Sequence, residues 1–169
     1  MGKKSRIAVL VAALLVGTGG LAALWVPPGY TRIELTEEGR GEKILSVVAA
    51  DGEPVTLTWH NSLFGLQVTE VFYARGGLII QDQVTFSDPG GAPPPRVSAR
   101  DIDDLYHTGG AFDARGLSRP FSRIVYRIGE IGDPRIMVKN KTAALKKAAG
   151  FGGRVILTTA RPKLYEILF

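Results

Sequence analysis

The sequence predicts an all-β fold: a small antiparallel sandwich or partly open barrel, preceded by one N-terminal transmembrane helix and with at most one short helix near the C-terminus. Segments rich in Val, Ile, Thr and aromatic residues recur between clusters of Gly, Pro, Asp and Asn, which is typical of antiparallel strands. Stretches with helical periodicity are scarce. A long apolar run divides the chain into a basic segment 1–6, the run 7–26 and a single domain 27–169.

The apolar run extends from Ile7 to Val26 and contains no charged residue. About 20 residues at 1.5 Å rise each match a hydrocarbon layer of roughly 30 Å, so the run is long enough to span a membrane. Lys3, Lys4 and Arg6 precede it and are expected to stay cytoplasmic, which places the rest of the chain outside. We therefore expect a single-pass protein of the cell (inner) membrane with an extracytoplasmic C-terminal domain.

A cleaved signal peptide is the alternative, because a basic region before an apolar stretch is also its signature. Gly20 and Ala22 make a mediocre cleavage site, and the run is longer than the usual apolar region of a signal peptide. Trp25 followed by Pro27 and Pro28 suits an interfacial aromatic and a helix stop, which favours the uncleaved anchor. Cleavage would leave a periplasmic or secreted domain.

The composition limits the chemistry of the exported part. The chain has 169 residues and no cysteine, which excludes disulfides and thiolate metal sites. The N-terminal cations supply much of the net charge of +5, so the basic pI does not predict nucleic-acid binding. We expect no cofactor, no metal site and no nucleic-acid partner.

The elements follow one another as short strands. We expect strands at residues 32–35, 43–49, 55–60, 66–74, 78–86, 121–128, 135–139 and 154–159. The best helix candidate is 141–149, which is rich in Ala and is followed by Gly150, and a weaker one is a turn of helix over 99–106. Residues 88–95 contain too much Pro and Gly for a regular element, and the polar stretch 96–120 is expected to be mobile.

The hairpin over residues 55–74 is the best-defined piece. Gly65 suits the first central position of a two-residue type II′ turn, because that position needs φ > 0. This register pairs Asn61 with Glu70. Alternation then places one carboxylate on an otherwise mainly apolar face, which consists of Leu57, Trp59, Asn61, Val68, Glu70 and Phe72.

Glu70 is therefore expected to find hydrogen-bond partners, to have a raised pKa or to line a solvated pocket, since burying an unpaired carboxylate is costly. The Asn61 amide is a plausible donor to it. At the next turn, Gly76-Gly77, two arrangements stay open. A strict two-residue turn would place Leu78 and Ile80 on the face opposite Glu70, and a bulge would place them on the same face.

Catalytic residues are not expected. His60, Ser62 and Glu70 are the residue types of an acyl-transfer site. However, neighbouring strand residues point to opposite faces, so His60 is expected to point away from Glu70, and no Gly-x-Ser-x-Gly sequence surrounds Ser62. A structural network or a ligand pocket is the favoured interpretation, and an envelope hydrolase is the least favoured one.

Three further patterns have simple explanations. Asp101, Asp103 and Asp104, even with His60 and His107, lack the glycine and the distal Glu of a calcium loop and are interpreted as solvated charges. Backbone amides at Gly90 and Gly91 could face an anion, although a plain turn is favoured. Arginines recur at residues 115, 119, 123 and 127, and at 123 and 127 they are expected on the solvated face of a half-buried strand.

The run Leu57-Thr58-Trp59-His60-Asn61-Ser62-Leu63, with Val68, Glu70 and the loop 88–93, resembles a bacterial and archaeal family of unknown function (DUF eighteen-fifty). Its members are often encoded beside, or fused to, components of TAXI-type TRAP transporters. The family pattern has an aromatic, a His-Ser pair and a Glu nine positions after the His. Trp59, Ser62 and Glu70 match it, whereas Asn61 stands at the histidine position and has no titratable proton.

The resemblance implies a small extracytoplasmic accessory domain with no established catalytic activity. Our leading hypothesis is therefore a membrane-anchored domain that assists a TRAP/TAXI-type solute transport system by contacting its membrane or binding-protein subunits. The alternative is an independent ligand-binding module with a pocket around Glu70. The candidate ligand or partner contacts are Trp59, His60, Asn61, Ser62, Glu70, Gly90 and Gly91.

Overall fold

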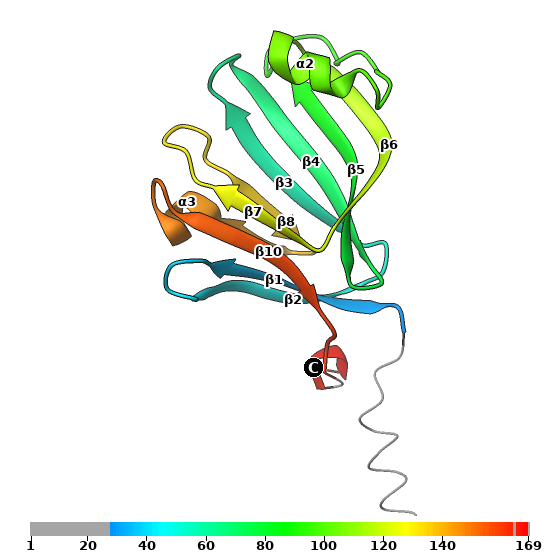
Figure 1. The fold of residues 1–169 in the computed structure, drawn as a ribbon, viewed down its shortest axis with the longest axis vertical. Coiled ribbons are helices and arrows are strands. Elements are labelled where there is room, and N and C mark those ends of the chain that lie inside the picture. Colours follow the sequence, from blue (N-terminus) through cyan, green and yellow to red (C-terminus); the bar gives the residue numbers. More distant parts are fainter. Residues whose placement is uncertain (1–27, 164, 169) are drawn as a thin grey trace, which may run out of the picture.

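The computed structural model describes residues 28–163 and 165–168 and shows two antiparallel sheets (Figure 1). The four-stranded sheet has the order β2-β1-β10-β7, formed by β1 (Tyr30–Glu37), β2 (Lys43–Ala50), β7 (Arg123–Arg127) and β10 (Arg154–Ala160). The six-stranded sheet has the order β6-β5-β4-β3-β8-β9, formed by β3 (Pro54–Asn61), β4 (Leu66–Arg75), β5 (Leu78–Ser87), β6 (Phe112–Phe121), β8 (Arg135–Val138) and β9 (Lys141–Ala144). The predicted all-β, antiparallel fold class is confirmed.

The described residues also contain three short helices, α2 (Ile102–Thr108), α3 (Leu145–Ala149) and α4 (Tyr165–Leu168). The expectation of at most one short helix is therefore wrong. The helix expected over 141–149 is half correct, because its first residues pair with β8 as β9 and the helix begins only at Leu145.

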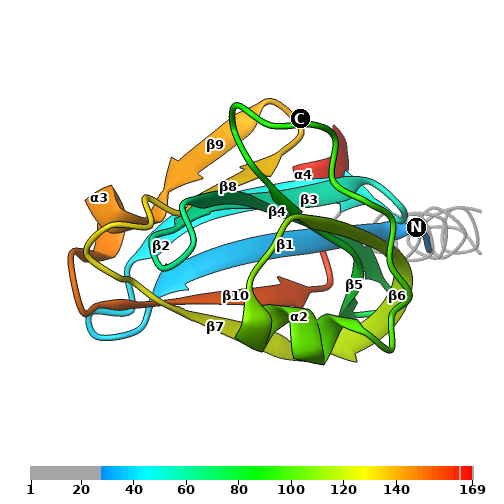
Figure 2. The same ribbon diagram turned by 90° about the horizontal axis from the view of Figure 1, so that it is seen from above.

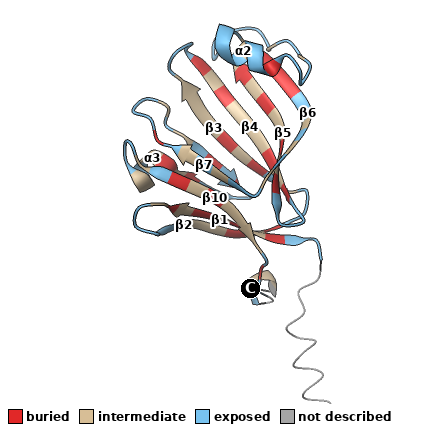
Figure 3. Ribbon diagram, in the orientation of Figure 1, coloured by how far each residue is buried: buried red, intermediate tan, exposed pale blue. Residues whose placement is uncertain are grey.

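The main core lies between the inner faces of the two sheets (Figure 3). Leu35 of β1 pairs with Leu157 of β10, and both are fully buried. They belong to one cluster with Leu57, Phe72 and Ile136 of the other sheet. Burial of such side chains stabilises each by about 1.5–3 kcal/mol, so this cluster holds the sheets together.

A second apolar cluster packs under α2, which covers one end of the six-stranded sheet (Figures 1 and 2). Ile102 of α2 is fully buried there, together with Phe86 and Phe112. α2 overlaps the weaker helix candidate over 99–106, whereas no strand was expected where β6 lies, and the expected mobility of residues 96–120 stays a prediction. Buried residues such as Ile102 and Phe112 anchor α2 and β6. β6 can contain Gly116 and Pro120 because it is an edge strand.

The β3–β4 hairpin has the predicted faces but a different register. Asn61 pairs with Leu66, and Leu57, not Asn61, pairs with Glu70. The predicted two-residue turn does not form. The Asn61 side-chain oxygen accepts hydrogen bonds from the backbone amides of Leu63 and Phe64, at 3.0 and 3.3 Å, and this arrangement makes the loop longer. The offset is an even number of residues, which leaves Glu70 on the same face as Leu57.

The β4–β5 hairpin resolves the alternative that was left open. Arg75 pairs with Leu78, so Gly76 and Gly77 form a two-residue turn, and Leu78 is 40% exposed on the face opposite Glu70. Farther along, the register shifts at Asp82, which has no partner in β4. This bulge turns Gln81 inward, where its side chain reaches Glu70.

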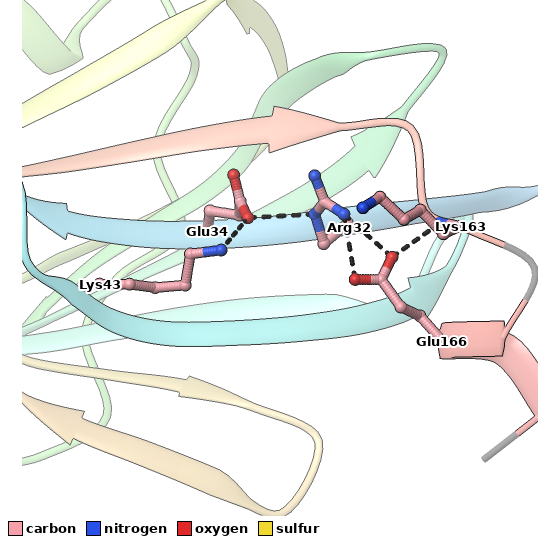
Figure 4. Close-up of polar contacts among 5 residues, drawn as sticks. All are labelled: Arg32, Glu34, Lys43, Lys163 and Glu166. Carbon is pink, nitrogen blue, oxygen red and sulfur yellow. Dashed lines mark hydrogen bonds and ion pairs between the residues drawn. The ribbon is translucent and has the colours of Figure 1, made fainter.

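Both ends of the described chain lie at one end of the molecule (Figure 1). The proposed membrane segment, residues 7–26, falls outside the described residues. In the part that is described, no helix is long and apolar enough to cross a membrane. The C-terminal helix α4 is tied to β1 by Glu166, whose carboxylate accepts two hydrogen bonds from Arg32 Nη1, at 3.1 and 2.9 Å (Figure 4).

Candidate functional site

A cleft of about 520 Å³ opens between the two sheets beside the main core. One wall is formed by β3 and Glu70 of β4, and the other by β7. The loop 129–134 closes one end, and it is held there because the His60 backbone amide donates to the Gly132 carbonyl at 2.7 Å. Leu57, Trp59 and Tyr126 give the interior an apolar and aromatic lining.

Glu70 is the acidic group on the inner wall of this cleft. Its two oxygens accept one hydrogen bond each, from Trp59 Nε1 at 3.1 Å and from Gln81 Nε2 at 2.7 Å. Among the described residues it forms no ion pair. Burial raises the pKa of the Glu70 carboxyl, and the two hydrogen bonds only partly oppose this effect. The predicted donor, the Asn61 side-chain amide, forms no hydrogen bond with Glu70, and the Asn61 side-chain oxygen accepts hydrogen bonds from the loop after β3.

Tyr126 lines the opposite wall, and its hydroxyl is buried without a hydrogen-bond partner. Burial, followed by the negative charge of Glu70, raises the pKa of Tyr126. The pKa of Tyr106 in α2 is raised to about 12, mainly by burial and to a smaller extent by the negative charge of Glu70. Both phenols therefore stay protonated at neutral pH, and both lie within the electrostatic reach of Glu70.

The exposed edge of the cleft is partly apolar. Leu63, Ile131 and Val125 belong to the lining and are 79%, 63% and 43% exposed. Exposed apolar residues that gather around a concave site often mark a binding surface. Arg127 and Glu130 add one charge of each sign to the lining.

Five of the seven predicted contact residues come together in this cleft: Trp59, His60, Asn61, Ser62 and Glu70. Their role in binding stays a prediction. The hydrolase hypothesis needs a hydrogen bond between Ser62 and an imidazole, and none is present among the described residues. Those residues also contain no group of three side chains placed to hold a metal ion.

The other two predicted residues, Gly90 and Gly91, lie outside the cleft lining. Their amides are already used, since Gly90 N donates to Asp88 Oδ1 and Gly91 N donates to the Asp88 carbonyl, both at 3.1 Å. This geometry is a plain turn, the alternative favoured from the sequence. Arg123 and Arg127 are exposed on β7, as predicted.

Gln81, Tyr126 and the loop 129–134 are parts of the site that sequence reasoning missed. Gln81 is a polar residue next to an apolar pair within β5, and it is buried. Such a residue needs a polar partner inside the fold, which was the available signal. Tyr126 lies within the strand expected at 121–128, but the sequence does not indicate that its hydroxyl lacks a partner.

Comparisons of the chain with protein-family models, with curated proteins and with solved structures gave no significant match. The resemblance to the transporter-associated family therefore stays a prediction.

Proposed function

We propose that this chain is a membrane-anchored, extracytoplasmic binding module that holds a small amphipathic molecule in the cleft between its sheets. The observation that carries the proposal is that a concave site reaches Glu70. Had this carboxylate been fully enclosed, its two hydrogen bonds would have explained it as a structural group. Instead it lines a cleft whose walls are largely apolar, which is the usual form of a small-molecule site.

The position of the cleft is compatible with an anchor at the N-terminus. The loop between β7 and β8, which closes one end of the cleft, lies away from the end where the described chain begins (Figures 1 and 2). If residues 7–26 span the membrane, as the sequence predicts, the cleft opens at a distance from the lipid surface. A soluble extracytoplasmic ligand could then reach it directly.

Binding can be measured through Trp59, because the chain has two tryptophans and Trp25→Phe leaves Trp59 alone. The full chain carrying this change, in lipid nanodiscs, is titrated with three compounds that share a cyclohexylmethyl body: the ammonium, the alcohol and the carboxylate. We expect a saturable change in Trp59 emission with at least one of them. A positive charge introduced at the edge of the cleft by Ile131→Lys should weaken this binding.

The matched control is Met137→Lys, since Met137 is an exposed apolar residue of β8 outside the cleft lining. This variant should bind as the parent does. If none of the three compounds gives a saturable response, or if both lysine variants lose binding equally, the cleft is not the binding site.

The transport-accessory hypothesis is a second proposal, and the exposed apolar residues of the cleft favour it. Leu63 and Ile131 are both exposed in the lining of one cleft, where a transporter subunit could cover them. Because the chain has no cysteine, Leu63→Cys provides a unique thiol for a photoactivatable cross-linker in native membranes. Capture of TRAP/TAXI subunits from position 63 but not from Met137→Cys would support the contact, and equal capture from both would contradict it.

A further inference from the structure

Glu70 has spare hydrogen-bond acceptors inside the cleft, while the donors of Asn61, Ser62 and Arg127, which also line the cleft, form no hydrogen bond with it. A carboxylate can accept about four hydrogen bonds, and Glu70 accepts two. Its two donors, Trp59 Nε1 and Gln81 Nε2, are both directed at it. The Tyr126 hydroxyl, which can accept as well as donate, is buried without a partner. A ligand group that reaches Glu70 therefore meets lone pairs without donors.

The charge of Glu70 is also uncompensated. No Lys, Arg or His among the described residues lies within ion-pair distance of it, although twelve other ion pairs are present there. Arg127 lines the cleft, but its side chain belongs to an exposed position on β7. A buried carboxylate without a counter-ion is unfavourable, and a bound cation would remove that penalty.

An ammonium group fits both conditions, because it has three donors, no acceptor and a positive charge. A hydroxyl head group satisfies some of the acceptors but leaves the charge of Glu70 uncompensated. A carboxylate head group would place a second negative charge beside Glu70, which is repulsive in a site of low dielectric. The apolar lining from Leu57, Trp59 and Val125 requires that the rest of the ligand be apolar.

We propose that the cleft binds primary amines with an apolar body, whose ammonium group donates hydrogen bonds to Glu70 and to the Tyr126 hydroxyl oxygen. The apolar body contacts Leu57, Trp59 and Val125. This assignment rests on the proposed function and names its ligand class.

The test uses the three cyclohexylmethyl compounds with the full chain at pH 7, and it compares their dissociation constants. We expect the ammonium to bind roughly tenfold or more tightly than the alcohol, since hydrogen bonds to a buried charge are worth more than neutral ones. The carboxylate should be the weakest. Glu70→Gln should remove the preference for the ammonium while the alcohol still binds.

Glu42→Gln is the matched control, because Glu42 is an exposed glutamate outside the cleft lining. It should leave the preference nearly unchanged, since solvent screens an exposed charge. Tyr126→Phe is a second variant, which should lower the affinity for the ammonium severalfold. Far-ultraviolet circular dichroism of each variant verifies that it is folded, and if Glu70→Gln is not, Tyr126→Phe decides.

Several results would overturn the assignment. These are equal affinities for the ammonium and the alcohol, tightest binding of the carboxylate, an ammonium preference that survives in Glu70→Gln, or its loss in Glu42→Gln alone. Binding of none of the three compounds is a different result, because it contradicts the proposed function itself and this assignment falls with it.

Discussion

Replacement of Trp59 by Phe tests the arrangement around Glu70. Trp59 packs against both apolar clusters, lies edge-on to Phe86 with the ring centroids 6.1 Å apart, and donates to Glu70 at 3.1 Å. A hydrogen bond to a charged group contributes about 1.5–3 kcal/mol, and the partial exposure of Trp59 favours the lower end. The smaller ring also loses about 1 kcal/mol of apolar burial. We expect Trp59→Phe to lower the free energy of unfolding by about 2–3 kcal/mol.

The assay is urea unfolding of the full chain in mild detergent, followed by far-ultraviolet circular dichroism. The midpoint should fall while the slope stays unchanged. Trp25→Phe is the chemically matched control and should not change the midpoint. In a double-mutant cycle, Trp59→Phe and Glu70→Gln should couple by about 1 kcal/mol. A Trp59→Phe variant as stable as the parent, or strictly additive effects, would refute the interaction.

Three further predictions concern polar groups. Burial raises the folded-state pKa of Glu70 above 4.5. The stability of the parent relative to Glu70→Gln should therefore be greatest below pH 4.5 and fall as the pH rises through that folded-state pKa. Urea unfolding of both proteins across this pH range measures the difference, and a constant difference would contradict the prediction. Tyr126→Phe removes a buried hydroxyl that has no hydrogen-bond partner. In thermal unfolding the variant should be as stable as the parent or more stable by up to about 1 kcal/mol. A clear loss of stability would show that the hydroxyl does have a hydrogen-bond partner. The Lys163 amide and Arg32 lower the pKa of Glu166, so its tie to β1 should be present above pH 4.5 and weaken below it. Amide exchange at residues 165–167 should therefore be faster in Glu166→Gln at neutral pH and similar to the parent in acid, whereas Glu42→Gln should change nothing.

Strand locations were predictable because alternation of buried and exposed residues is a local signal. Strands were expected at 32–35 and 154–159, and the structure pairs these segments as β1 and β10. By contrast, β6 begins with Phe112 and then continues through Arg, Gly, Ser and Pro, so its pairing with β5 leaves almost no pattern in the sequence. It is a strand because its partner β5 offers an edge.

Much of the candidate site was also predictable, because residues on one face of a hairpin stay together even when the register shifts. Trp59 and Glu70 illustrate this, since a wrong register still placed them on one face. The partner of Glu70 was not predictable. Gln81 reaches it only because Asp82 forms a bulge, and one extra residue in a strand changes the face of every residue beyond it.

The features around Glu70 that lower stability gather in one place, and this argues for a function there. A buried carboxylate without a counter-ion and a buried hydroxyl without a partner face the same cleft, whose lining includes the exposed Leu63 and Ile131. Packing does not require them, since apolar replacements of buried charged groups are often neutral or stabilising. A purely structural Glu70 would serve to orient Trp59 and Gln81, and a Gln at position 70 can do the same once the Gln81 amide turns over. If that exchange preserves the fold but abolishes the preference for an ammonium, orienting its neighbours cannot be the reason for the carboxylate, and the charge itself has to be the functional property of residue 70.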